Sequence, residues 1–229
     1  KDVTSHGARL ASGAPTVSVE DQFIVTKTST ASNGAIVSSA STTVFAENKG
    51  DVVTHGGLTT YYRSNGQALG GSIFTSAAND NTSIEYNGFS ERSRDYKSGS
   101  GQTINDTYYR QNGHSLTFAH KLDSDNIITL KATKTSVGFA GFPNEYMDMI
   151  SNESKSYNLG YKGKLNGIYI TANAYYQTVD HFMDKLKEER STTSSMPMNT
   201  AVKETGYNLK LTIPYDSIHT VKIGTDYDQ

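Results

Sequence analysis

The 229-residue sequence contains no cysteine and no tryptophan, only four prolines, and no long run of apolar residues. Without cysteine, disulfides, zinc–thiolate sites and thiol catalysis are excluded. A membrane-spanning helix is excluded as well, because it would need about 18 consecutive apolar residues. The chain opens at Lys1 without an initiator methionine or an apolar segment, so we expect it to be mature or internal sequence.

The amino-acid composition further narrows the possible classes of protein. Apolar residues make up only 35% of the sequence, yet its fifteen tyrosines and eight phenylalanines are too many aromatic residues for a disordered chain. Low hydrophobicity combined with regular strands is typical of a β-barrel whose interior is wet. The formal net charge is −2 and the basic residues are scattered, so nothing indicates a nucleic-acid partner.

Alternation of apolar and polar residues predicts nine antiparallel strands. Their expected ranges are 53–63, 68–78, 82–91, 105–121, 126–138, 154–165, 168–182, 203–214 and 218–228. The predicted fold class is all-β, an antiparallel up-and-down meander that forms a segment of a transmembrane β-barrel. Residues 51–229 are the expected partial barrel, and residues 1–50 a lead-in or plug remnant. Because bacterial single-chain barrels have an even number of strands, a count of nine means either that one strand is miscounted or that part of a larger barrel is missing, and we expect the second.

The predicted links between strands are of two kinds. Short links with turn residues are expected at 79–81, 122–126, 166–167 and 215–217, and they alternate with long polar links at 92–104, 139–153 and 183–202. Outer-membrane barrels sort their connections in this way, with tight turns on one side and long loops on the other. A soluble β-sandwich has no reason to do so.

The two faces of the later strands differ in polarity. Leu209 and Leu211 alternate with Lys210, and we expect lysines on the polar face only, because each would cost roughly 2 to 4 kcal/mol in lipid near the midplane. Tyr157, Tyr176 and Tyr207 fall on the apolar face near the ends of their strands. They are therefore predicted to form an aromatic girdle at the membrane interface.

Soft metal ligands gather at the end of the strand predicted at 168–182. Continuing its alternation places His181 and Met183 together on the polar face. An imidazole nitrogen and a thioether sulfur in this arrangement select copper, Cu(I) above all. The alternative is a solvated histidine beside a methionine that only fills space, since methionine is normally a core residue.

Two further pairs of methionines repeat this spacing. Met196 and Met198 flank Pro197, and Met147 and Met149 flank Asp148. All five methionines are expected in or beside two long loops and none in the middle of a strand. This distribution suits a funnel for a soft metal, and equally suits loops that pack on each other. No catalytic spacing, nucleophile elbow or phosphate loop is present, so we do not expect an enzyme.

Four motifs carry a resemblance to a known family: FPNEYMDM (142–149), VDHFMD (179–184), MPMNT (196–200) and HTVKIGTDYDQ (219–229). Together they resemble TonB-dependent outer-membrane receptors, most closely the copper receptors of the OprC/NosA type, from about Val44 to the C-terminus. The resemblance implies copper import across the bacterial outer membrane, driven by the TonB complex through an N-terminal plug in a 22-stranded barrel. It also implies that His181 and Met183 form the barrel half of a site that a plug cysteine and methionine complete. The plug half has no match, because this chain lacks cysteine.

Three hypotheses follow. The first is a copper receptor in contact with outer-membrane lipid, with copper as Cu(I) or Cu(II) as its cargo. The second is a siderophore or other metal-chelate receptor of the same family, whose site would use basic residues such as Arg63, Arg92, Arg94 and Arg190. The third is a surface β adhesion module, which would have an inward apolar core and would be soluble without detergent.

Overall fold

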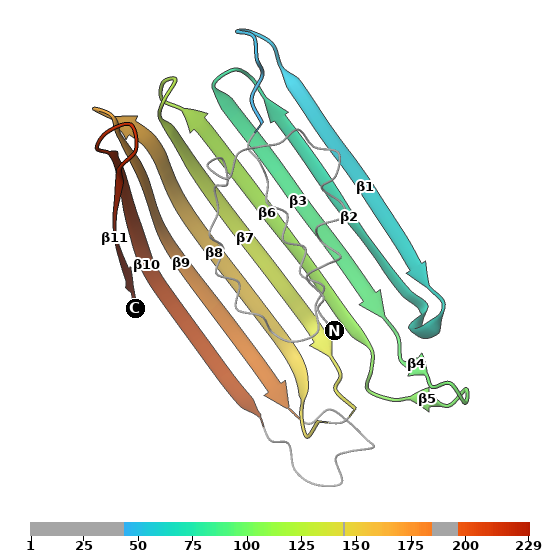
Figure 1. Cartoon of the computed structure of the whole chain (residues 1–229). Helices are drawn as coiled ribbons and strands as arrows, with labels where there is room; N and C mark the ends of the chain where they lie inside the picture. Colours follow the sequence, from blue (N-terminus) through green and yellow to red (C-terminus); the bar gives the residue numbers. More distant parts are fainter. Residues whose placement is uncertain (1–43, 144, 185–196) are drawn as a thin grey trace. The chain divides into compact units, whose positions relative to one another are not determined.

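The computed structural model describes residues 44–143, 145–184 and 197–229, and these form one nine-stranded antiparallel sheet with a small two-stranded hairpin beside it (Figure 1). The sheet strands are β1 (Val53–Arg63), β2 (Ala68–Ala78), β3 (Thr82–Ser93), β6 (Tyr109–Lys121), β7 (Ile127–Ala140), β8 (Asp148–Leu165), β9 (Ile168–Asp184), β10 (Met198–Pro214) and β11 (Thr220–Asp228). The hairpin consists of β4 (Tyr96–Lys97) and β5 (Thr103–Ile104), and a short 3-10 turn, η3 (Asn65–Gln67), joins β1 to β2.

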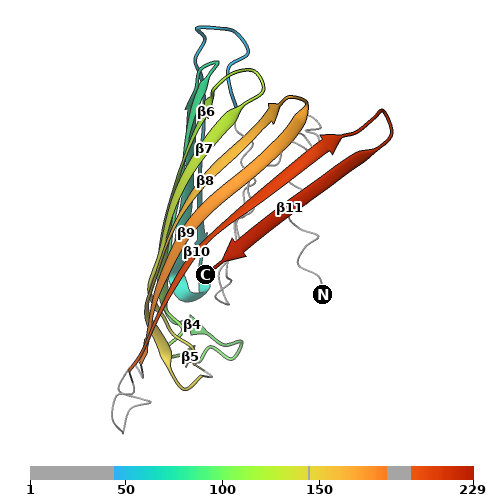
Figure 2. The same ribbon diagram turned by 90° about the vertical axis from the view of Figure 1, so that its left-hand side faces the viewer.

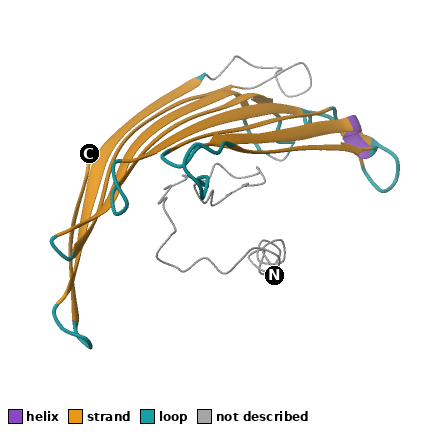
Figure 3. Ribbon diagram, turned by 90° about the horizontal axis from the view of Figure 1, so that it is seen from above, coloured by secondary structure: helices purple, strands orange, loops and turns teal. Residues whose placement is uncertain are grey.

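Each strand of the sheet pairs with the next sheet strand along the chain, which gives the order β1-β2-β3-β6-β7-β8-β9-β10-β11. The predicted up-and-down meander is therefore confirmed. Within the described part of the chain, β1 and β11 are the two edges of the sheet, which is bent across its strands (Figures 2 and 3). No helix in these ranges is long and apolar enough to cross a membrane.

The connections leave the sheet at two opposite ends. One end, here called the turn end, holds the links 79–81, 122–126, 166–167 and 215–219. At the tightest of them, Asn166 and Gly167 have φ of 51° and 83°, the conformation of a two-residue hairpin turn that suits an Asn-Gly pair. The other end, the loop end, holds the links 64–67 and 94–108 and the described residues between β7 and β8, and it is also where β9 ends and β10 begins.

The structure corrects several boundaries at the loop end. β8, β9 and β10 continue into the predicted links 139–153 and 183–202, so Met149, Met183 and Met198 are strand residues rather than loop residues. The link 64–67 is short although it lies on the side of the long loops. β6 begins at Tyr109, because the Asp95 side chain accepts hydrogen bonds from the backbone N–H groups of Thr107 and Tyr108, at 2.7 and 2.9 Å, and folds that segment away from β3.

The sheet has two chemically distinct faces. Residues that are directly opposed on neighbouring strands share a face, so the pairing register shows which residues belong to each. The apolar face includes the row Leu130, Leu159, Ala174, Tyr207 and Tyr227 on five successive strands. The polar face includes Asn158, Tyr175 and His181. Large side chains of the apolar face remain exposed, for example Leu159 at 51% and Ile223 at 54%.

One prediction about the faces is wrong. Lys134 and Lys155 are directly opposed and both lie on the apolar face, as does Lys203. Lysines are thus not confined to the polar face. The three lie on the loop-end side of Tyr157 and Tyr176, outside the most apolar band, where the cost of a charge falls.

Candidate metal site

Three methionines form a row across the polar face at the loop end. Met149 of β8 pairs with Met183 of β9, and Met183 pairs with Met198 of β10. Directly opposed residues have Cβ atoms about 4.5 to 5.5 Å apart, and unbranched methionine side chains reach easily over that distance. The register therefore places three thioether sulfurs within reach of one point on the sheet.

Met149 reaches this row through a β-bulge. Simple alternation from Asn152 would direct Met149 to the apolar face. Between Met149 and Ser151 the pairing with β9 shifts by one residue, so that Ile150 is the extra residue. A bulge re-aims the side chains that follow it, and here it restores Met149 to the face of Met183.

His181 lies one step from Met183 along the same face. Its ring Nδ1 is 3.0 Å from the side-chain Oδ1 of Asn152, its partner on β8. In the tautomer that donates Nδ1–H to this oxygen, Nε2 holds the lone pair that a metal requires. Asn152 therefore orients the imidazole, and Thr200 opposes it on β10.

Exposure falls along the methionine row. Met198 is 41% exposed, Met183 is half-buried and Met149 is only 6% exposed. Beside Met149, the buried carboxylate of Asp148 accepts a 2.7 Å hydrogen bond from the backbone N–H of Phe142 and so holds Phe142 near the start of β8. The row thus runs from an accessible donor to a sheltered one.

The same cross-strand row continues beyond the methionines with different chemistry. Met149 is opposed by Ala140 on β7, Ala140 by Tyr109 on β6, and Tyr109 by Ser93 on β3. Around Tyr109 the side chains form an ionic cluster that sequence reasoning missed, since only the register brings together residues 18 to 46 positions apart.

The ionic cluster centres on the carboxylate of Glu91. It receives hydrogen bonds from Arg63, from the Tyr109 hydroxyl and, at 3.0 Å, from Nε2 of Gln111. The Arg63 guanidinium also donates to the Tyr109 hydroxyl at 3.1 Å and lies 5.3 Å from the centre of the Tyr61 ring. Arg63 is thus engaged by partners within the sheet.

The other predicted ligands have different outcomes. Met147 lies in the bend before β8 and is not part of the row. Met196 and Arg190 lie outside the described residues. Within the described ranges, no three His, Cys, Asp or Glu side chains converge as a metal site would require, so the donors that the register assembles are soft ones.

Comparison with known proteins found no matching family model and no matching curated protein. Among solved structures, the chain is similar to the copper transporter OprC, with a TM-score of 0.70 and 22% sequence identity. The likeness is one of fold. It covers 80% of this chain but only 29% of the transporter, so the chain spans less than a third of that protein's length. The meander thus has the fold of part of a transporter barrel, as the predicted fold class required.

Proposed function

We propose that this chain is part of a bacterial outer-membrane transporter that takes up copper. The observation that carries the proposal is the row of Met149, Met183 and Met198 on one face, with His181 beside it. Thioether and imidazole donors together prefer copper, and Cu(I) most of all. The likeness in fold to a copper transporter supports the same cargo.

The gradient of exposure suggests the order of events. Copper first meets Met198, the most exposed of the three methionines, and passes to Met183 and His181, while Met149 closes the site from its sheltered side. Met147 and Met196 would add further sulfur donors before this step. Release would need the TonB complex to act on a plug, for which residues 1–50 are the candidate remnant.

The chelate-receptor alternative has less support. Arg63 is engaged by Glu91 and Tyr109, and Arg92 is opposed to Leu69 on the apolar face. These guanidinium groups therefore do not converge on the polar face, where a chelate would bind. The adhesion-module alternative needs an inward apolar core, yet the buried apolar side chains of the described residues are few: Ala46, Ala68, Ala78, Ala119 and Met149.

The test is Cu(I) affinity of the protein in detergent, measured by competition with a chromogenic chelator. Changing His181→Ala together with Met183→Leu should weaken binding about 100-fold, because two donors are lost. Phe182→Leu is the matched control, since it lies between them on the opposite face. Unchanged affinity in the double variant would contradict the proposal and favour the chelate receptor.

A further inference from the structure

A row of basic residues crosses the apolar face. His114 of β6 pairs with Lys134 of β7, and Lys134 pairs with Lys155 of β8. Lys155 is opposed to Thr178 on β9, which is opposed to Lys203 on β10. His114, Lys134, Lys155 and Lys203 are here called the basic row.

The position of the basic row is defined by the tyrosines next to it. Tyr86, Tyr157 and Tyr176 lie in the adjacent cross-strand row toward the turn end, and the rings of Tyr157 and Tyr176 stack with centroids 6.5 Å apart. Beyond them come apolar residues such as Leu130 and Leu159. Tyrosines mark the border between acyl chains and headgroups, so the basic row lies at headgroup level.

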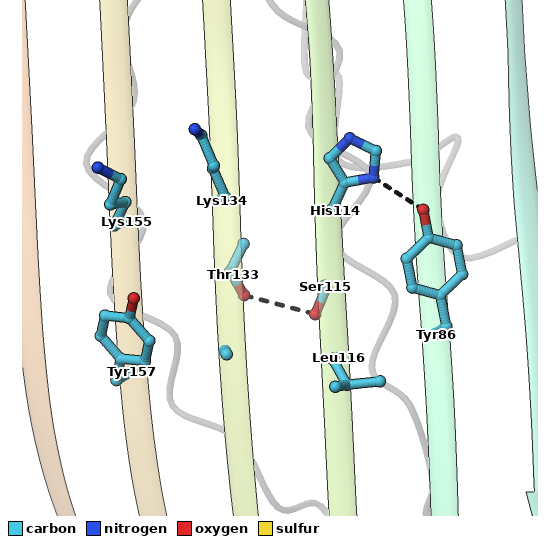
Figure 4. A pocket seen from close by; sticks show the side chains of 9 residues that line it. Tyr86, His114, Ser115, Leu116, Thr133, Lys134, Lys155 and Tyr157 are labelled. Carbon is cyan, nitrogen blue, oxygen red and sulfur yellow. Dashed lines mark hydrogen bonds between the residues drawn. The ribbon is translucent and has the colours of Figure 1, made fainter.

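The surface around the basic row is shallowly hollowed. A shallow hollow of about 190 Å³ is lined by Tyr86, His114, Leu116, Lys134, Lys155 and Tyr157, among others. Figure 4 shows Lys134 and Lys155 side by side and extending in the same direction, with the Tyr86 hydroxyl held 2.7 Å from His114 Nδ1. Tyr157 also lines a second hollow of about 410 Å³, together with Leu130, Leu159, Ala174, Tyr176 and Tyr207. A basic hollow and an apolar hollow are therefore contiguous.

The charges of the basic row are only partly compensated. Directly opposed like charges repel each other across a sheet, so Lys134 and Lys155 need an anion. Both ammonium groups bind the same carboxylate, Glu153, at 2.9 and 2.5 Å. Asp180, opposed to Glu153, is the other acidic side chain in the next row, so two carboxylates face three lysines.

We propose that the basic row binds the phosphate-bearing headgroup of an anionic lipid in the leaflet on the loop side of the membrane. The phosphate completes the compensation of Lys134 and Lys155, and an acyl chain of the same lipid occupies the apolar hollow below Tyr157. The inference rests on the membrane placement proposed above. A soluble anion would use the basic hollow alone, whereas a lipid uses both.

The test uses the purified protein in lipid nanodiscs that contain phosphatidylglycerol and phosphatidylcholine, with bound lipid counted by native mass spectrometry after release into detergent. Wild-type protein should retain phosphatidylglycerol over phosphatidylcholine. Lys134→Gln with Lys155→Gln should reduce that retention about 10- to 30-fold. Lys155→Arg should keep it, because the charge remains.

The control has the same change in charge on the other face. Lys210→Gln with Lys222→Gln removes two lysines from the polar face of β10 and β11 and should leave lipid retention unchanged. Equal retention of both lipids by wild type would overturn the lipid site, and so would full retention of phosphatidylglycerol by the Lys134/Lys155 variant. If the protein still inserts and binds copper, the proposed function is unaffected. Failure to insert into nanodiscs would overturn the membrane placement as well.

Discussion

One cross-strand row on the polar face changes its chemistry half-way along. On β8, β9 and β10 it consists of Met149, Met183 and Met198, whereas on β3 and β6 it consists of Ser93 and Tyr109, with Ala140 between the halves. Both halves lie at the loop end, so depth in the sheet does not distinguish them. The half with the three methionines is here called the thioether half. The half with Ser93 and Tyr109 is called the ionic half, because Tyr109 belongs to the cluster around Glu91. The two halves differ in which ligands they can still bind.

In the ionic half, the strong hydrogen-bonding groups bind one another. Glu91 accepts from Arg63, Tyr109 and Gln111, and this stabilises the sheet without offering a site. In the thioether half, the methionine sulfurs are weak hydrogen-bond acceptors, and they interact strongly only with soft metals. Under the proposed function, cargo recognition belongs to the thioether half and stability to the ionic half.

The largest effect is expected from removing the sheltered donor. Met149→Leu preserves volume but removes a sulfur, so Cu(I) affinity should fall about 10- to 100-fold while the free energy of unfolding changes little. Chelator competition and urea unfolding in detergent measure the two quantities. If affinity is kept, the row ends at Met183 and the bulge at Ile150 has no role in binding.

A smaller effect should come from lengthening the thioether half. Ala140 is directly opposed to Met149, so Ala140→Met adds a fourth sulfur to the row and should tighten Cu(I) binding about threefold. The matched control is Ala140→Leu, which adds bulk without sulfur and should give no gain. Equal gains in both variants would show that packing, not coordination, is responsible.

Disrupting the ionic half should alter stability and leave copper binding alone. Glu91→Gln weakens the charge-assisted hydrogen bonds from Arg63 and Tyr109, so the free energy of unfolding should fall by about 1 to 2 kcal/mol. Cu(I) affinity should stay within about threefold of wild type. A loss of copper binding as large as that of Met149→Leu would remove the distinction between the halves.

The smallest effect is expected at the turn end. A hydrogen bond from the backbone N–H of Ile218 is the main cause that holds the pKa of Asp216 below its usual value, and the His219 side chain is the second. A lowered pKa stabilises the fold at any pH above the unfolded-state pKa, and this contribution disappears as the pH falls through the folded-state pKa. Asp216→Asn should therefore unfold at slightly lower urea near pH 7 and match wild type at about pH 2.

That variant also serves as a distant control for copper. Asp216 lies at the opposite end of β10 from Met198, so Asp216→Asn should bind Cu(I) as wild type does. A difference between wild type and variant that stays constant with pH would show that the turn geometry, and not the charge of Asp216, is responsible.

Much of the fold could be predicted from alternation alone. β1 and β2 lie where the sequence predicts them, because both are bounded by clear turn residues. The longer reach of β8 to β10 was missed, since polar residues such as Asn152, Asp184 and Thr200 resemble loop residues in a sequence although they pair across the sheet.

The candidate site was less predictable. His181 and Met183 follow from local alternation, but the alignment of Met149 and Met198 with them depends on register and on the bulge at Ile150. The Glu91 cluster and the basic row were missed for the same reason, because their members come together only through pairing between strands. Local periodicity carries no information on that pairing.

The most direct test of the thioether row is X-ray absorption at the copper edge of the Cu(I)-loaded protein. The account predicts a sulfur shell at about 2.3 Å, the usual metal–sulfur distance, with at least one nitrogen neighbour. The sulfur shell should be lost when Met149, Met183 and Met198 are all changed to leucine. A wild-type spectrum with only nitrogen or oxygen neighbours, or a sulfur shell that survives in the triple variant, would contradict it.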